Sequence, residues 1–333
     1  MPQKPEITFL TRPIDVGQKS YYLILRAFLK NIWYGVRGIK IPEPPEFGGH
    51  SAVTRSVIHG FRNIGIPVNL DPESIEEVAD TVHVLSDVNA LKQAISWKQN
   101  GEIKKLVAGP NLVVLPTDDL AISSPEIDLF LVNSQWTRAV YIDDLPLLDK
   151  KIDIWPSGVD INYWQPREEI KRNQKALIYI KDETCFDLIE RCEDCLSEKG
   201  FILKRLVYGK YELEEFKKEL SSSRVSIFFS AHESQGIALA EAWAMDVPTI
   251  VWEPGIIKIK RKDSSKEEER HCSSAPYLTN SCGLFFKTES EFKESLSKFL
   301  KNQKSYSPRK WVIENLSDEK SASNLQDIIF KNA

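Results

Sequence analysis

One stretch of the chain places a polar loop and a helical pattern between two short apolar runs. Residues 225–229 read Val-Ser-Ile-Phe-Phe, and Val247–Trp252 is a second apolar run. Between them, the polar residues 232–236 precede a helical pattern over Ile237–Met245. Strand, loop, helix and strand in this order predict an α/β unit, in which ligands bind at the carboxyl ends of the strands.

Two glutamates occupy positions in this unit where a ligand is expected. Glu233 lies in the loop after the first strand, and Glu241 lies within the helix. The free N–H groups of Gly236 and Ile237 at the start of the helix can meet an anionic or hydroxyl-rich ligand. A carboxylate accepts two hydrogen bonds side by side, so Glu241 suits a vicinal diol such as a ribose. Glutamates at this spacing also occur on solvated helix faces, and it is the flanking strands that favour a site.

The same alternation of strands and helices recurs along the chain. Apolar runs without polar alternation indicate strands covered on both faces, and therefore parallel sheets. A charged segment over Glu168–Lys175 without apolar periodicity predicts a linker. A length of 333 residues suits two domains. The expected strands are Ile7–Leu10, Ile66–Leu70, Val82–Leu85, Leu106–Ala108, Asn111–Leu115, Leu129–Val132, Ala176–Ile180 and Phe201–Val207, and the expected helices are Gln18–Gly35, Ser51–Gly65, Val88–Asn100, Phe186–Lys199 and Leu213–Leu220.

Composition excludes several classes of protein. The formal net charge of −4 gives no general electrostatic case for binding nucleic acid. Five cysteines are scattered, and the pair Cys192 and Cys195 lies within an expected helix without a second pair at zinc-site spacing. Free thiols suit the cytoplasm. The residues after Met1 lack the pattern of a signal peptide, and no run reaches the roughly twenty apolar residues that span a bilayer.

Three segments resemble one family of enzymes. Ala231–Pro254 resembles the signature of retaining GT-B glycosyltransferases in which seven residues separate two glutamates (the family 4-like, or group 1, glycosyltransferases). Residues 151–160, Lys-Ile-Asp-Ile-Trp-Pro-Ser-Gly-Val-Asp, are similar to the hinge of these enzymes. Gly48-Gly49-His50 is similar to their N-terminal glycine loop. The three segments follow the order of the family, so the resemblance spans most of the chain.

The resemblance implies an α/β protein of the GT-B fold, with two Rossmann-like domains facing a cleft. Residues 1–166 would form the acceptor-binding domain, and residues 167–317 the domain that binds a nucleotide sugar. In relatives the last helix returns to the N-terminal domain. Here residues 318–333 are expected to do so, because Leu325, Ile328 and Ile329 form one apolar stripe.

The resemblance also implies roles for individual residues on the donor side. Glu233 would be the catalytic residue in contact with the donor sugar, and Glu241 would bind the ribose. Relatives usually carry an arginine after the first strand of the second domain and a lysine nearby. Lys181 stands at the arginine's place, and Arg205 or Lys210 is the candidate for the second cation. The expected donor-binding residues are Glu241, Gly236, Ile237, Ser234, Gln235, Lys181 and Arg205.

On the acceptor side the match is less complete. Gly48, Gly49 and His50 would form an acceptor or phosphate loop, because glycines let the backbone approach a phosphate closely. The histidine that many relatives carry after a central strand is missing, and Thr117 and Asp118 are the candidates for its position. Asp118 is also suited to capping a loop. His232, beside Glu233, is a further candidate, although a lone histidine is more often structural.

The predicted function is metal-independent transfer of a sugar from a nucleoside diphosphate to an acceptor hydroxyl. The acceptor class stays open between a glycan, a lipid-linked sugar and a small molecule, and no cofactor or nucleic acid is expected. Aromatic and basic residues over Lys19–Lys40 suit either core packing or the inner face of a membrane. Pro254–His271 borders the expected donor site. Its basic residues suit either contact with a diphosphate or an anionic acceptor, or a solvated excursion. The alternatives are a nucleotide- or glycan-binding protein without turnover and a sugar-nucleotide epimerase of the same fold.

Overall fold

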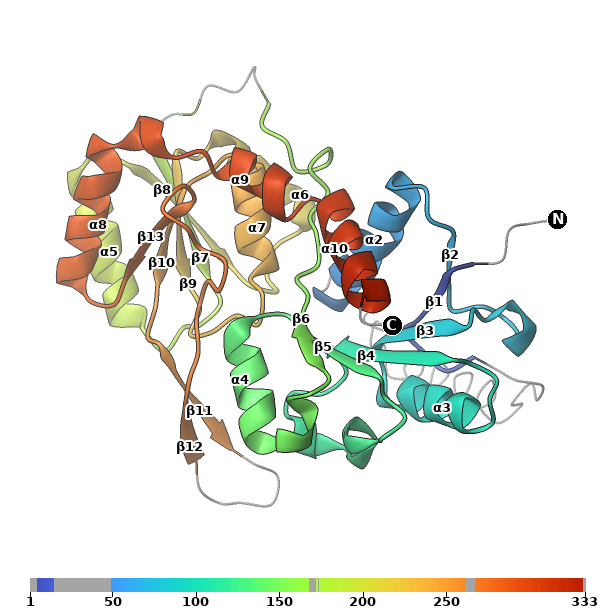
Figure 1. Cartoon of the computed structure of the whole chain (residues 1–333). Helices are drawn as coiled ribbons and strands as arrows, with labels where there is room; N and C mark the ends of the chain where they lie inside the picture. Colours follow the sequence, from blue (N-terminus) through green and yellow to red (C-terminus); the bar gives the residue numbers. More distant parts are fainter. Residues whose placement is uncertain (1–4, 15–48, 168–171, 173, 261–266, 332–333) are drawn as a thin grey trace, which may run out of the picture.

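Two parallel sheets organise the chain. The computed structural model describes residues 5–14, 49–167, 172, 174–260 and 267–331, and Figure 1 shows the two sheets with helices around them. The expected helix Gln18–Gly35, the segment Lys19–Lys40, residue Gly48 and most of the expected linker lie outside the described residues.

The first sheet is six-stranded and has the order β2-β1-β3-β4-β5-β6, with every neighbouring pair parallel. Helices α3 (Val88–Gln99) and α4 (Gln135–Asp144) cover one face, and α2 (Gly49–Asn63) and α10 (Asp318–Lys331) cover the other. Burial on both faces explains why these strands are continuous apolar runs. The strands are β1 (Ile7–Leu10), β2 (Val68–Leu70), β3 (Thr81–Ser86), β4 (Lys105–Asn111), β5 (Leu129–Val132) and β6 (Ile152–Ile154).

The second sheet is five-stranded and parallel, with the order β13-β10-β9-β7-β8. One face packs on α5 and α8, and the other on α6, α7 and α9. Its strands are β7 (Lys175–Ile180), β8 (Ile202–Val207), β9 (Val225–Phe229), β10 (Thr249–Trp252) and β13 (Gly283–Phe286). Its helices are α5 (Phe186–Glu198), α6 (Leu213–Ser222), α7 (Ile237–Ala244), α8 (Glu289–Lys301) and α9 (Pro308–Asn315). Short 3-10 turns span Ile75–Glu77, Pro116–Asp118, Leu120–Ser123, Pro146–Leu148 and Gln303–Ser305.

Most of the expected elements are confirmed with ends shifted by a few residues, but the strand expected over Asn111–Leu115 is wrong. Strand β4 ends at Asn111, and the following residues form a loop. Side chains satisfy the backbone of this loop: Asp118 Oδ2 accepts the Leu115 N–H at 2.9 Å, and the Tyr141 hydroxyl donates to the Val113 carbonyl at 2.7 Å. The apolar residues 112–115 therefore lie in a loop and not in the interior of a sheet.

The segment over Pro254–His271 contains a hairpin, most of whose described residues are exposed. Strands β11 (Ile256–Lys260) and β12 (Glu267–His271) pair antiparallel and run alongside α4 in Figure 1. Arg270 Nη2 lies 3.1 Å from Asp144 Oδ1, and Arg270 Nη1 lies 3.4 Å from Asp143 Oδ2, at the end of α4. These ion pairs between the domains hold the hairpin against α4. No local sequence pattern indicated this contact.

The chain returns to the first sheet through its last helix. Ala322, Leu325 and Ile329 of α10 are buried in the cluster that contains β1 and α2 (Figure 1). The backbone before this helix pairs with the hinge after β6, because Val159 and Ser317 form a parallel bridge. The apolar stripe of α10 is thus buried on the face of the first sheet, against elements distant in sequence.

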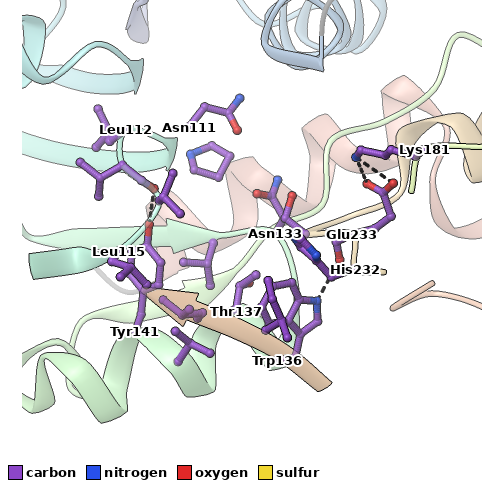
Figure 2. Close-up of a pocket in the computed structure, with 18 residues that line it drawn as sticks. Asn111, Leu112, Leu115, Asn133, Trp136, Thr137, Tyr141, Lys181, His232 and Glu233 are labelled. Carbon is purple, nitrogen blue, oxygen red and sulfur yellow. Dashed lines mark hydrogen bonds and ion pairs between the residues drawn. The ribbon is translucent and has the colours of Figure 1, made fainter. Parts of the chain in front are cut away.

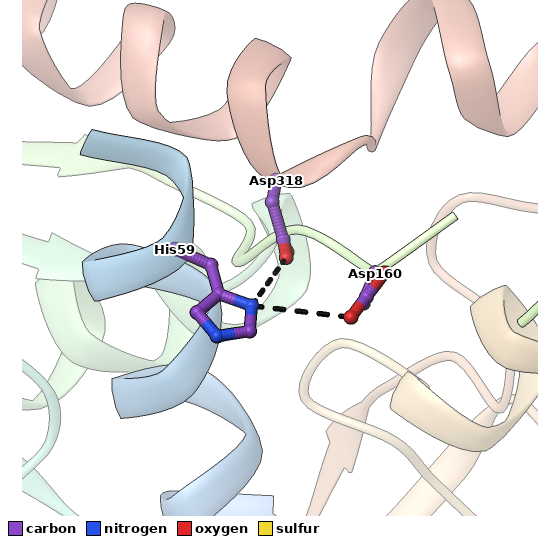
Figure 3. A group of neighbouring side chains, drawn as sticks. All are labelled: His59, Asp160 and Asp318. Carbon is purple, nitrogen blue, oxygen red and sulfur yellow. Dashed lines mark ion pairs between the residues drawn. The ribbon is translucent and has the colours of Figure 1, made fainter. Parts of the chain in front are cut away.

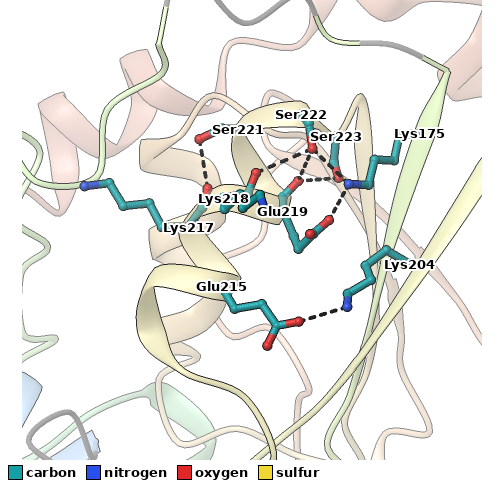
Figure 4. A network of polar contacts seen from close by, with 9 residues as sticks. All are labelled: Lys175, Lys204, Glu215, Lys217, Lys218, Glu219, Ser221, Ser222 and Ser223. Carbon is teal, nitrogen blue, oxygen red and sulfur yellow. Dashed lines mark hydrogen bonds and ion pairs between the residues drawn. The ribbon is translucent and has the colours of Figure 1, made fainter.

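Ion pairs anchor α6 to the second sheet, as Figure 4 shows. The ammonium of Lys175, at the start of β7, bonds to Glu219 and donates to Ser222 Oγ at 3.0 Å. Lys204 of β8 lies 2.8 Å from Glu215. The Lys175–Glu219 pair is largely buried, whereas the Lys204–Glu215 pair is exposed. An exposed pair contributes about 0–1 kcal/mol, so the Lys204–Glu215 pair orients the helix more than it stabilises it.

Candidate functional site

A cavity of about 390 Å³ lies between the two sheets. Its walls come from the loop after β4, the start of α4, the residues after β7 and β9, and strand β11, as Figure 2 shows. Parallel strands bring their carboxyl ends to one edge, which is why these loops meet. The lining residues are Pro110, Asn111, Leu112, Val113, Val114, Leu115, Val132, Asn133, Trp136, Thr137, Val140, Tyr141, Lys181, His232, Glu233, Ser234, Ile257 and Ile259.

An ion pair lies at the wall formed by the second sheet. Lys181 Nζ is 2.8 Å from Glu233 Oε1 and 2.9 Å from Oε2 (Figure 2). Ser230 Oγ also donates to Oε1, at 2.9 Å. Lys181 follows β7 and Glu233 follows β9, two strands that adjoin in the sheet. The structure therefore brings together two residues that the sequence placed in one site, although they are 52 positions apart.

The loop that carries Glu233 is tied to the first sheet. Trp136 Nε1 donates to the Glu233 carbonyl at 2.9 Å. Gln235 Oε1 accepts bonds from the N–H and hydroxyl of Ser157, both at 3.0 Å, and Gln235 Nε2 donates to the Ser157 carbonyl at 2.7 Å. The amide of Gln235, expected to bind the donor, is thus engaged with the hinge and positions the loop. Ser234 does line the cavity.

Glu241 lies deeper than the sequence suggested. Its residue is 8% exposed, and it is not among the residues that line the cavity. Burial raises the pKa of the Glu241 carboxyl to about 8, and the charge of Arg55 on α2 opposes this shift. Burial disfavours the charged form of a carboxyl, and Arg55 offsets this effect only in part. Glu241 is therefore largely neutral below about pH 8.

The start of α7 has the backbone geometry expected for a ligand-binding helix. Gly236 precedes the helix with φ of 84°, a left-handed conformation that glycine adopts without strain. A Cβ there would meet Leu239 Cδ1 at 3.0 Å. Ile237 packs against the buried cluster of the first sheet, so this helix end faces the other domain.

Several other expected residues do not come to the cavity. Arg205 bonds to Glu193 of α5, and its guanidinium carbon Cζ lies 5.6 Å from the ring centroid of Phe186. It therefore lies on the face of the sheet that α5 covers. Lys210 pairs with Glu183 at 3.3 Å. Neither Arg205 nor Lys210 lines the cavity, so neither residue is at the position expected for the second cation of a phosphate clamp.

The remaining candidates occupy different environments. Thr117 is exposed, and Asp118 caps the loop before it, which confirms the capping role. His232 lines the cavity, its ring lies 6.2 Å from that of Trp136, and burial lowers its pKa. Gly49 is the first residue of α2, followed by His50.

Sequence reasoning missed residues that shape the cavity from the first sheet. Asn133 and Trp136 flank the start of α4, and the Tyr277 hydroxyl bonds to the Asn133 carbonyl. Ile257 and Ile259 reach the cavity from the hairpin. An apolar run after β4 was the available signal, but it was attributed to a strand.

The fold and the cavity together define a class, that of proteins with the GT-B fold, two Rossmann-like domains facing one another. The structure resembles the apo form of the lipopolysaccharide outer core galactosyltransferase WaaB, with a TM-score of 0.55 and 14% identity over 98% of this chain and 99% of that one. It also resembles sucrose-phosphate synthase (tll1590) from Thermosynechococcus elongatus, with a TM-score of 0.53 and 10% identity over 99% of each chain. At these identities the likeness shows the fold.

A third similar structure is the catalytic domain of Starch Synthase IV from Arabidopsis thaliana bound to ADP and acarbose. Its TM-score is 0.50 and its identity 11%, over 75% of this chain and 72% of that one. No family model matches the sequence, and no curated protein matches it either. Within the described ranges, no helix has the length and apolar character needed to cross a membrane.

Proposed function

We propose that the protein transfers a sugar from a nucleoside diphosphate to an acceptor hydroxyl, with retention and in the metal-independent manner that the sequence resemblance implies. The observation that carries this proposal is the Lys181–Glu233 pair, which lies at the carboxyl ends of adjoining strands and borders a cavity between two GT-B domains. The fold of the similar glycosyltransferases supports it.

Each residue of the pair has a chemical role in this proposal. A departing diphosphate accumulates negative charge, which the Lys181 ammonium and the N-terminus of α7 stabilise. Glu233 contacts the donor sugar, and its bonds to Lys181 and Ser230 hold the carboxylate in one orientation. Residues 167–317 bind the nucleotide sugar, while residues 1–166, on which the last helix packs, bind the acceptor.

Glu241 binds the ribose in this proposal, but a ligand must first reach it. The carboxyl is buried where α7 faces α2, outside the cavity. Binding of the nucleoside therefore requires α2 and α7 to separate, a movement about the hinge near Gly158. Ribose hydroxyls donate to a carboxylate, so the ionised form of Glu241 is the one that binds.

The test is a panel of UDP-, GDP- and ADP-sugars, assayed for protection against thermal unfolding and for donor hydrolysis. A ligand at 100 times its Kd adds about 2.7 kcal/mol of stability, so a matching donor stands out. Glu233→Gln should lower turnover of that donor by about 10²–10³, the loss seen when one stabilising group is removed from an active site. The exposed Glu198→Gln is the matched control, and equal turnover in both variants would contradict the assignment.

Lys181 provides a prediction about the phosphates. Lys181→Ala should weaken binding of the nucleoside diphosphate by about 1.5–3 kcal/mol, the range for hydrogen bonds to charged groups. Binding of the bare nucleoside should change little. Calorimetry with both ligands measures the difference, and equal losses for the two would place Lys181 away from the phosphates. Lys210→Ala, which removes an exposed lysine outside the cavity lining, is the control.

One observation favours a second function, nucleotide or glycan binding without turnover. Among the described residues that line the cavity, Lys181 is the only lysine or arginine, since Arg205 faces α5. A single cation suits binding better than stabilisation of a departing diphosphate. Protection by nucleoside diphosphates together with undetectable donor hydrolysis would identify this second function.

A further inference from the structure

A histidine and two aspartates converge where three separate segments of the chain meet (Figure 3). His59 lies on α2, Asp160 in the hinge after β6, and Asp318 at the first residue of α10. His59 Nδ1 is 3.9 Å from Asp160 Oδ2 and 4.0 Å from Asp318 Oδ2, and the three ligand atoms lie within 4.8 Å of one another. This cluster is outside the cavity described above.

The main chain sets the geometry of the cluster. The bridge between Val159 and Ser317 precedes Asp160 and Asp318 by one residue each, so the two aspartates emerge side by side. The Asp318 N–H donates to the Val159 carbonyl at 3.3 Å. The positions of both carboxylates thus follow from backbone pairing rather than from the flexibility of long side chains.

Two glycines, one on α2 and one in the hinge, allow both segments to approach the start of α10 closely. A Cβ on Gly60, one residue after His59, would lie 2.3 Å from the Asp318 carbonyl oxygen. A Cβ on Gly158 would lie 2.6 Å from the Asp318 Cα. Such distances leave no room for a side chain, so α2 and the hinge both contact the backbone at the start of α10 directly.

The polar atoms of the cluster are incompletely paired. Asp318 is 4% exposed, and within the described part of the chain its Oδ1 has no hydrogen-bond partner. Asp160 Oδ1 accepts the N–H groups of Asn162 and Tyr163, both at 2.9 Å, which leaves Oδ2 facing His59. The separations of 3.9 and 4.0 Å are too long for hydrogen bonds. The Asp318 carboxylate has a hydrogen bond with Ser56 and interacts with the charge of Arg55, while its unpaired Oδ1 remains available to a cation.

We propose that His59, Asp160 and Asp318 bind a divalent transition metal ion, with Zn²⁺ the preferred ion. One imidazole nitrogen and two carboxylate oxygens are donors that Zn²⁺ accepts, and a water completes a tetrahedral site. With bonds of about 2.0–2.2 Å, tetrahedral ligand atoms are roughly 3.4 Å apart. The two separations from His59 Nδ1 therefore need to close by roughly half an ångström, a shift within reach of the half-exposed His59 side chain. The two carboxylate oxygens lie within 4.8 Å of one another and need to approach by at most roughly 1.4 Å.

The surroundings give an ion access to the cluster. A cavity of about 360 Å³ is lined by the three residues together with Arg62 and Glu319, whose charges offset one another. The two backbone N–H groups that bond to Asp160 orient its carboxylate, as hydrogen bonds to ligating carboxylates do in metal sites. A bound ion would tie α2, the hinge and α10 together, and so restrain movement of the domains about the hinge. None of the three residues belongs to the proposed donor site, so the metal site stands or falls separately from the transfer reaction.

Titration of the chelator-treated full-length chain with ZnCl2 tests the site. Calorimetry should show one Zn²⁺ bound per chain at this cluster, and Zn²⁺ should raise the melting temperature. His59→Ala and Asp160→Asn should each weaken this binding at least about tenfold, since even changes to outer-shell partners cost that much. The control His271→Ala removes an exposed histidine of the hairpin and should leave binding unchanged.

Two further readouts separate this site from zinc bound elsewhere. Because the chain has five free cysteines, Co²⁺ is used in place of Zn²⁺, and its spectrum should lack thiolate charge-transfer absorption. Circular dichroism reports whether each variant is folded. The proposal is overturned if the wild-type chain binds no Zn²⁺, if binding survives both substitutions, or if the Co²⁺ spectrum shows thiolate ligation.

Discussion

Truncation after Ser321, which removes most of α10, should destabilise the protein by about 5 kcal/mol or more and leave much of it unfolded. Leu325 and Ile329 are fully buried, and Ala322 is 1% exposed. Each buried leucine or isoleucine contributes about 1.5–3 kcal/mol, and the truncation also uncovers Phe61 and other apolar side chains beneath the helix. Total stabilities are about 5–15 kcal/mol, so a loss of this size is severe.

Urea unfolding and binding of a dye to exposed apolar surface measure the effect. A single substitution separates packing from chain length: Leu325→Ala should cost about 2–5 kcal/mol. Phe330→Ala, in the same helix but 39% exposed, should cost much less. A truncated chain that keeps the wild-type midpoint, or equal losses for the two substitutions, would show that α10 contributes little to stability.

The second large effect concerns pH, because the carboxyl of Glu241 is buried. Its pKa in the folded chain is about 8, against 4.5 for the ordinary value. Between these pH values the folded state binds more protons than the unfolded state, so stability falls as pH rises. At 1.36 kcal/mol per pH unit, the loss of stability is on the order of 5 kcal/mol and is complete above pH 8.

Glu241→Gln should abolish this part of the pH dependence, because the amide stays neutral. Urea midpoints at pH 5.5 and 8.5 give the comparison, with the variant gaining stability relative to the wild-type chain at the higher pH. Burial also raises the pKa of Asp318 to about 7, and subtracting the variant's pH profile from the wild-type profile cancels that contribution. Parallel profiles for the wild-type chain and Glu241→Gln would mean that Glu241 is not buried as described. Glu198→Gln is the control.

Local patterns predicted most of the second sheet well, since the apolar runs and helical periods there are short-range signals. The strands over Ala176–Ile180 and Val225–Phe229 appear as β7 and β9 with the start of β7 shifted by one residue. Helix α8 is not among the expected elements, although Phe292, Leu296 and Phe299 form a buried stripe at helical spacing. The local signal for this helix is therefore present in the sequence.

The candidate site was predictable where it depends on the order of elements. Lys181 and Glu233 each follow a strand of a parallel sheet, and such strand ends gather at one edge. The same reasoning failed for Arg205, because its side chain bonds to Glu193 on a neighbouring helix. The sequence of a strand does not indicate which helix carries the acidic residue that pairs with an arginine of that strand.

The sequence by itself determined the two α/β series and the order of their strands and helices, because hydrogen bonding along the chain and the apolar period are local. Only the tertiary structure decided that Glu241 is buried, that the loop after β4 lines a cavity, and that His59 meets Asp318. The reason is physical. Exposure, pKa and side-chain pairing depend on which surfaces come together, and those surfaces belong to segments hundreds of residues apart.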